Sequence, residues 1–145
     1  TEEKSVKFNI SKTISILLKN YESKKYEFVS NENFHFNGRE NLIKRCIQNI
    51  LENGLAYGEK IFVEIKKSMN NLIITVEDNG PGIPKSEYIN VFRPFYRIDK
   101  SRGLNKSGVG LGLSVSQDIV KSHGGNISLS ESRQKGLCVK ISLPF

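Results

Sequence analysis

The sequence predicts an α/β sandwich in which a mixed β-sheet carries helices on one face. Segments that alternate apolar and polar residues, typical of half-buried strands, are interleaved with segments whose apolar residues recur every three or four positions, as on an amphipathic helix. The two kinds follow no strict strand–helix–strand rhythm, which favours a mixed sheet. A chain of 145 residues is long enough for one core, so residues 1–145 are expected to form a single domain.

Seven segments have the alternation or the β-branched residues of a strand. They are residues 5–9, 25–29, 33–36 (a strand or a short extended piece), 60–68, 72–78, 126–131 and 136–143. The turn residues 69–71 separate KIFVEIKKS from LIITVED, and this predicts a hairpin.

Helices are expected at residues 10–21, 42–58 and 109–123, with a short helix at 84–92 and an irregular polar segment at 93–107. Asn9 or Ser11 is expected to cap the first helix. Asn37 followed by Glu40 fits a capping pattern for the second. The pair Gly124-Gly125 ends the last helix.

Composition narrows the cellular setting. The net charge of +7 suits nucleic acid, anionic lipid, a phosphate ligand or a solvated lysine-rich surface, and alone decides nothing. Cys46 and Cys138 lie in apolar patterns, so buried free thiols are expected, with a structural disulfide as the alternative. No signal peptide and no apolar run of transmembrane length are present. Because the chain begins at Thr1 and its only methionine is Met69, a fragment of a longer protein is expected.

The helix at 42–58 carries an unusual polar face. Asn49, Asn53 and Tyr57 stand at positions i, i+4 and i+8 and therefore share one side. The opposite side is apolar and consists of Ile43, Ile47, Ile50 and Leu51. A buried carboxamide needs a partner. Amide oxygens one turn apart can ligate Mg²⁺, which usually arrives with phosphates.

The sequence DNGPGIP follows the strand at 72–78. Asp78, at the strand's end, can accept a hydrogen bond from an exocyclic amine such as that of adenine. Gly80 and Gly82 permit positive φ and let a flat ligand approach the backbone. The alternative is an ordinary tight turn capped by the aspartate.

A second glycine-rich stretch, KSGVGLGLSVSQDIV, opens the helix at 109–123. Gly108, Gly110 and Gly112 lie where free N–H groups and the helix dipole favour an anion, although a flexible loop packed on the sheet is an equal alternative. Before it, residues 91–107 contain aromatic anchors and cations and suggest an active-site lid, with an ordinary basic loop as an equal alternative. These residues are Phe92, Phe95, Tyr96, Arg93, Arg97, Lys100, Arg102 and Lys106.

Taken in chain order (42–58, 78–84, 91–107 and the glycine-rich start of the last helix), these stretches resemble the N, G1, F and G2 boxes of the catalytic ATP-binding domain of bacterial two-component sensor histidine kinases, in particular the osmosensor-like class coupled to OmpR. The resemblance covers essentially the whole chain, including the final ISLPF and the helix end IVKSHGG. It implies the Bergerat fold, with about five strands covered on one face by about three helices, and it implies ATP and Mg²⁺ as ligands.

The resemblance also implies residue roles. Asn53 would ligate Mg²⁺ with help from Asn49, and both count as catalytic. Tyr57 would stack near the adenine, and Asp78 would take its amino group. The remaining ATP contacts would be made by Gly80, Gly82, Ile83, Phe95, Arg97, Arg102, Gly108, Gly110, Leu111, Gly112 and Leu113, with Phe92 as a further anchor of the lid.

Two positions depart from the family pattern. Ala56 stands where many relatives carry a phosphate-binding Lys or Arg, so a lid cation, Lys106 or Arg102, is expected to substitute. Cys138 stands where Thr or Ser is common in the last strand, and it is expected to face the adenine-binding aspartate. A thiol is the poorer hydrogen-bond partner there.

The resemblance favours phosphoryl transfer to a histidine over ATP hydrolysis. Hydrolysing relatives carry a glutamate where Asn49 stands, and an amide cannot act as a base. Neither His35 nor His123 has the setting of a phospho-acceptor; His123 at a helix end suits an imidazolium. The acceptor is therefore expected on a separate dimerisation domain. The alternative is an ATP-binding module without catalysis.

The implied parent is a homodimeric sensor of the bacterial inner membrane, with this domain in the cytoplasm and an OmpR-like response regulator as partner. Nucleic-acid binding through the basic surface is a third hypothesis, but the chain lacks a recognisable reading motif, so no nucleic-acid partner is expected.

Overall fold

The computed structural model describes residues 2–96 and 112–145. Its main sheet has five strands in the order β2-β4-β5-β7-β6. The strands are β2 (Tyr26–Ser30), β4 (Ile61–Ser68), β5 (Asn71–Asp78), β6 (Asn126–Glu131) and β7 (Leu137–Pro144). Only β2 and β4 pair in parallel, and the other neighbours are antiparallel. The predicted mixed sheet is confirmed, as is the hairpin that joins β4 to β5.

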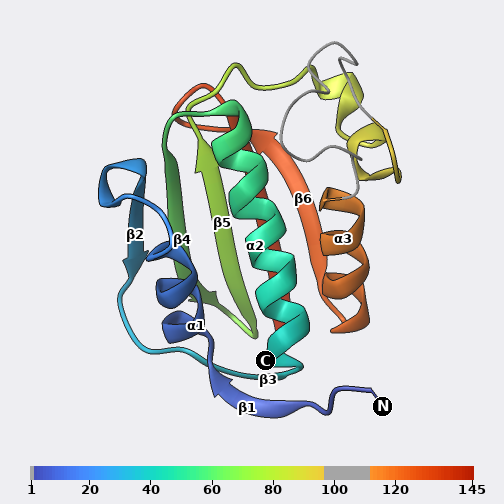
Figure 1. The fold of residues 1–145 in the computed structure, drawn as a ribbon. Coiled ribbons are helices and arrows are strands. Elements are labelled where there is room, and N and C mark those ends of the chain that lie inside the picture. Colours follow the sequence, from blue (N-terminus) through green and yellow to red (C-terminus); the bar gives the residue numbers. More distant parts are fainter. Residues whose placement is uncertain (1, 97–111) are drawn as a thin grey trace.

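The described part of the chain contains three α-helices, which lie on one face of the sheet (Figure 1). They are α1 (Ile10–Leu18), α2 (Glu40–Tyr57) and α3 (Gly112–Ser122). Helix α2 crosses the middle of the sheet, and α1 and α3 flank it. The apolar side of α2 is buried as predicted, and Ile43, Ile47, Ile50 and Leu51 are each at most 1% exposed. This burial stabilises the layer and fixes which side of α2 remains accessible.

A separate two-stranded sheet covers the opposite end of the layer from the ends of α2 and β5 (Figure 1). It pairs β1 (Val6–Asn9) with β3 (His35–Gly38) in antiparallel fashion. Phe8 and Phe36 pack edge to face, and Phe36 reaches the ring of His123 at the end of α3.

The first helix begins as predicted, since Asn9 accepts a hydrogen bond from the backbone N–H of Lys12. It ends at Leu18 rather than at residue 21. The N–H groups of Asn20 and Tyr21 bond three residues back, which tightens the chain into a turn. The short helix expected at 84–92 is instead two 3₁₀ turns, η2 (Lys85–Glu87) and η3 (Asn90–Phe92).

The expected cap of the second helix is wrong. Arg39 is the N-cap residue of α2 and makes no side-chain capping bond. The carboxylate of Glu3, far away in sequence, accepts hydrogen bonds from the N–H groups of Asn41 at 2.8 Å and Leu42 at 3.2 Å. A cap from a residue distant in sequence leaves no local pattern. The sequence therefore wrongly indicated Asn37 and Glu40, which lie close to the start of the helix.

His123 differs from expectation as well, because it is a neutral imidazole. Its Nδ1 lies 2.8 Å from the carbonyl oxygen of Ile119, so it must donate, and its Nε2 accepts from the N–H of Arg39 at 3.1 Å. The ring therefore joins the end of α3 to the start of α2.

Both cysteines are free and buried, so the disulfide alternative is wrong. Cys46 lies between α2 and α3, where Ser116 Oγ donates to its carbonyl oxygen at 2.9 Å. Burial raises the pKa of the Cys46 thiol to about 12, although a hydrogen bond with Ser116 acts in the opposite direction.

Candidate functional site

The candidate site lies where α2 and β5 end, at the same edge of the layer (Figure 1). Two glycines permit this close approach. A Cβ atom at Gly80 would lie 2.6 Å from the carbonyl oxygen of Tyr57, and one at Gly54 would lie 2.8 Å from Cγ2 of Ile61. The last turn of α2 therefore packs directly against the turn that follows Asp78. The sequence did not indicate the role of Gly54.

Asp78 is almost fully enclosed, with 5% of its surface exposed. Its Oδ1 accepts hydrogen bonds from the N–H groups of Gly80 at 2.9 Å and Leu137 at 3.2 Å. Within the described residues, Oδ2 has no hydrogen-bond partner. Burial raises the pKa of Asp78 above its usual value, and the two N–H bonds offset this only in part. A carboxylate with one oxygen held and the other unpartnered fits an external donor.

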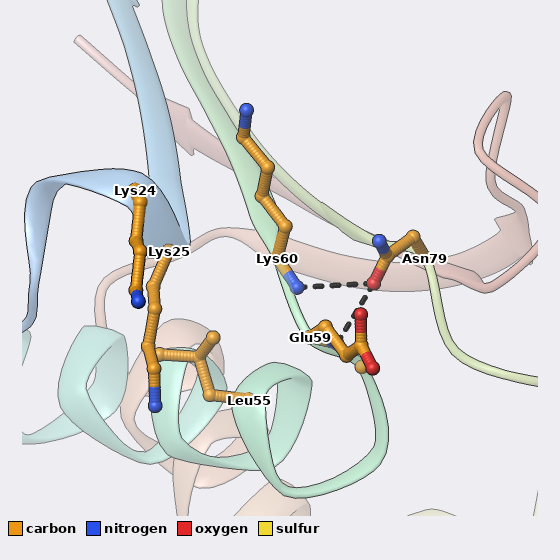
Figure 2. Close-up of a pocket in the computed structure, with 7 residues that line it drawn as sticks. Lys24, Lys25, Leu55, Glu59, Lys60 and Asn79 are labelled. Atoms are coloured by element: carbon orange, nitrogen blue, oxygen red, sulfur yellow. Dashed lines mark hydrogen bonds between the residues drawn. The ribbon is translucent and has the colours of Figure 1, made fainter.

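Asn79 links the end of β5 to the connection between α2 and β4. Its place in a DNG turn is consistent with such backbone hydrogen bonding. Its Oδ1 accepts from the backbone N–H groups of Glu59 at 2.8 Å and Lys60 at 3.0 Å, as Figure 2 shows. The connection from α2 to β4 is thus tied to the end of β5.

A surface depression of about 530 Å³ adjoins Asn79 (Figure 2). Its lining is Lys24, Lys25, Leu55, Gly58, Glu59, Lys60 and Asn79, and none of these was predicted for the nucleotide site. Lys60 pairs with Glu27 at 2.8 Å, and Lys24 pairs with Glu22 at 3.4 Å. Most of the positive charge of this depression is therefore neutralised, and it does not form a cationic pocket.

Asn49 and Asn53 lie inside α2, one turn apart, and both are half-buried. Neither amide hydrogen-bonds to another described residue. Tyr57, one turn further on, is 45% exposed. Amide oxygens that are partly sheltered and unpaired match the donors a hard cation such as Mg²⁺ takes from proteins.

The loop after Asp78 agrees in part with prediction. Gly82 has a positive φ of 71°, whereas Gly80 is needed for its closeness to Tyr57. Ile83 packs against the core. The side chain of Phe92 also packs there, whereas that of Phe95 does not, and the lid that Phe95 is expected to anchor lies largely outside the described residues. Phe95 is 70% exposed and has a left-handed backbone, with φ of 64°.

The start of α3 supplies the last described residues of the site. Gly112 begins this helix, and a Cβ atom added to it would have no described atom within 4 Å, whereas Leu113 is buried in the core. The remaining predicted contacts lie outside the described residues. They are Arg97, Arg102, Lys106, Gly108, Gly110 and Leu111.

The expectation that Cys138 faces Asp78 is wrong. Cys138 is paired with Glu77 in the β5–β7 register, and successive residues of a strand point to opposite faces. Its thiol therefore lies on the face away from the helices. Leu137 is the residue that meets Asp78, through its backbone N–H. The presence of Cys138 in place of the common Thr or Ser therefore does not affect the hydrogen bond between Leu137 and Asp78.

Residues 38–145 match the family described as histidine kinase-, DNA gyrase B-, and HSP90-like ATPase. The chain belongs to this family.

Curated relatives are sensor histidine kinases. GtrS of Pseudomonas aeruginosa is 37% identical over 107 residues, covering 74% of this chain and 22% of the relative. WalK of Bacillus subtilis is 31% identical over 160 residues, covering 99% of this chain and 26% of the relative. The chain thus spans about a quarter of the length of these relatives.

Solved structures share the fold. The mycobacterial sensor histidine kinase MprB has a TM-score of 0.82 at 22% identity, with 97% of both chains covered. The ATP-binding domain of PrrB from Mycobacterium tuberculosis has a TM-score of 0.80 at 21% identity, with 98% of both chains covered. Among the described helices, none has the length and apolar character to cross a bilayer.

Proposed function

We propose that this domain binds Mg-ATP and transfers the γ-phosphoryl group to a histidine on a separate dimerisation domain, in two-component signalling. The contact between Tyr57 and Gly80 carries the proposal, because it brings the amide-bearing helix and the buried Asp78 to one edge of the layer. Membership of the ATPase family and the names of the curated relatives support it.

In this proposal Asp78 selects the base. The exocyclic amine of adenine donates to Oδ2, while the backbone N–H groups of Gly80 and Leu137 hold Oδ1. A guanine would present a carbonyl oxygen at the same place, and two acceptors repel each other. The exposed ring of Tyr57 supplies an apolar surface beside the base.

Asn53, assisted by Asn49, would hold Mg²⁺ on the phosphate side of the site. When bound, the ion neutralises charge on the transferring phosphoryl group. The two amides position this charge and take no proton, since a carboxamide is not a base. The proposal therefore includes slow hydrolysis of ATP.

The two histidines of this chain do not serve as the acceptor. Both ring nitrogens of His123 are engaged by backbone groups, and His35 lies on β3, at the end of the layer remote from Asp78. A histidine acceptor must therefore come from another domain. The whole protein is proposed to be a homodimeric bacterial membrane sensor that holds this domain in the cytoplasm and signals to an OmpR-like response regulator.

The test is transfer of labelled phosphate. The domain is mixed with γ-labelled ATP, Mg²⁺ and a dimerisation domain from the same parent protein. Acid-labile, base-stable label on that second domain is expected, with Asn53→Ala as the inactive control. Tight ATP binding without any transfer would instead establish the alternative, an ATP-binding module without catalysis. The observation that still favours this alternative is Ala56, which stands where many relatives carry a phosphate-binding Lys or Arg.

A further inference from the structure

The turn between β6 and β7, residues 132–136, is bound on both faces of the sheet to the end of β5. Glu77 and Asp78 are consecutive and therefore point to opposite faces. Glu77 Oε1 accepts from the backbone N–H of Arg133 at 2.8 Å, and its Oε2 accepts from Nη2 at 2.6 Å and Nε at 3.1 Å. On the helix side, Asp78 accepts from the N–H of Leu137.

This turn is closed by a backbone hydrogen bond and packs closely against Asp78. The N–H of Ser132 bonds to the carbonyl oxygen of Gly136 at 2.8 Å, and Lys135 has a left-handed φ of 79°. A Cβ atom at Gly136 would lie only 2.0 Å from Oδ1 of Asp78 and 2.4 Å from its carbonyl oxygen. Any displacement of the turn must therefore move the Asp78 carboxylate or remove one of its two N–H donors.

The two carboxylates are held very differently. Burial raises the pKa of Glu77, but the hydrogen bonds with Arg133, the charge of Arg133 and a hydrogen bond with Ser132 together outweigh burial, and the net pKa lies below the usual value. For Asp78, the effect of burial exceeds that of the two backbone hydrogen bonds, and the pKa lies above the usual value. Charge-assisted hydrogen bonds are the stronger kind. Glu77 is thus held by a charged side chain as well as by a backbone N–H, whereas Asp78 is held by the backbone N–H groups of Gly80 and Leu137 alone.

We propose that Glu77 and Arg133 are positioning residues for recognition of the purine amine. By fixing the β6–β7 turn against β5, they hold the Leu137 N–H, and through it the Asp78 carboxylate, in the position that meets this amine. The inference rests on the proposed function, in which Asp78 binds that amine. Glu77 and Arg133 contact no nucleotide themselves and act through the turn.

The experiment compares ATP with purine riboside triphosphate, which lacks the 6-amino group. Affinities are measured by calorimetry with Mg²⁺ for wild type, Arg133→Gln, Glu77→Gln and the double variant. Wild type is expected to prefer ATP by about tenfold or more, the value of one hydrogen bond to a charged group. Each single variant is expected to lose about fivefold in ATP affinity while purine riboside triphosphate binds as before, and the double variant is expected to lose no more than either single one, as for groups acting together.

Two further variants serve as controls. Lys140→Gln removes a cation from the same strand face as Cys138 and is expected to bind both nucleotides like wild type. Arg133→Lys keeps the charge but offers fewer side-chain donors than the guanidinium, so an intermediate preference is expected. It also carries the test if Arg133→Gln does not fold.

Three outcomes would overturn the inference. If both nucleotides weaken equally in Arg133→Gln and Arg133→Lys, the pair has a structural role only. If the preference for ATP is unchanged in both, the clamp does not position Asp78. If wild type itself shows no preference for ATP, the assignment of Asp78 to the base is wrong, and this refutes the proposed base contact before the clamp is considered.

Discussion

The backbone N–H of Leu137 donates to Oδ1 of Asp78 at 3.2 Å, joining the start of β7 to the end of β5. Together with the N–H of Gly80, this bond leaves Oδ2 as the carboxylate oxygen without a described partner. Burial raises the pKa of Asp78, so the protein without a ligand makes the ionised form of this carboxyl less favourable than it is in water. Such a group is expected to serve a ligand at the expense of stability.

Asp78→Asn is therefore expected to abolish tight ATP binding without destabilising the domain. The amide oxygen can keep both backbone bonds, which turns Nδ2 toward the adenine amine, so two donors face each other. ATP affinity should fall by about tenfold to a hundredfold, the range for a hydrogen bond to a charged group. Calorimetry measures this loss, and thermal unfolding without nucleotide should give a Tm equal to or above that of wild type.

The pH dependence supplies a second check on Asp78. Because the folded-state pKa is raised, this group favours folding below its unfolded pKa, and that contribution is lost as the pH rises through the folded-state pKa. The difference in unfolding free energy between Asp78→Asn and wild type should therefore grow from acidic to neutral pH. A difference that shrinks over this interval would contradict the cause given for the shift.

Asn53→Ala is expected to weaken ATP binding through the metal alone. Affinity with Mg²⁺ should fall by about tenfold, equivalent to about 1.4 kcal/mol. Affinity with EDTA present should stay as in wild type. Glu52→Gln, the exposed neighbour on the same helix, is the matched control and should bind like wild type in both conditions. Equal losses with and without Mg²⁺ would show that Asn53 does not act through a cation.

The sequence predicted those parts of the fold that depend on local periodicity. The apolar stripe of α2 and the alternation in β4 reflect burial on one side, which residues close in sequence determine. The sequence did not predict hydrogen bonds between residues that lie far apart along the chain. The cap from Glu3 to α2, the clamp between Glu77 and Arg133, and the backbone bond from Leu137 to Asp78 each join segments many residues apart.

The misplacement of Cys138 has the same origin. Placing Cys138 beside Asp78 assumed a register for β7 that was wrong by one residue, and a shift of one residue sends a side chain to the other face. Phe95 was predicted to anchor the lid because it is aromatic. Its ring is exposed and its φ is positive, and neither property follows from the residue type.

Glu3→Ala is expected to destabilise the domain by removing the only side-chain cap of α2 seen in the described residues. Loss of a helix cap costs about 1 kcal/mol, with a corresponding Tm decrease of about 3 °C for a chain of this size. Glu2→Ala is the control, because Glu2 is exposed. Hydrogen exchange should also accelerate at the N–H groups of Asn41 and Leu42, which lose their acceptor. Unchanged exchange there would contradict the cap.

The two thiols are expected to resist alkylation to different degrees. Cys46 is 1% exposed and its pKa is raised to about 12, so almost no thiolate forms at pH 8. Cys138 is 8% exposed, and burial raises its pKa as well. With iodoacetamide, peptide mass spectrometry should find Cys138 modified first and Cys46 only when the domain unfolds. Because Cys46 packs against Ser116 between α2 and α3, its modification should coincide with loss of ATP binding. Rapid labelling of Cys46 in a domain that still binds ATP would show that this helix contact opens independently of the site.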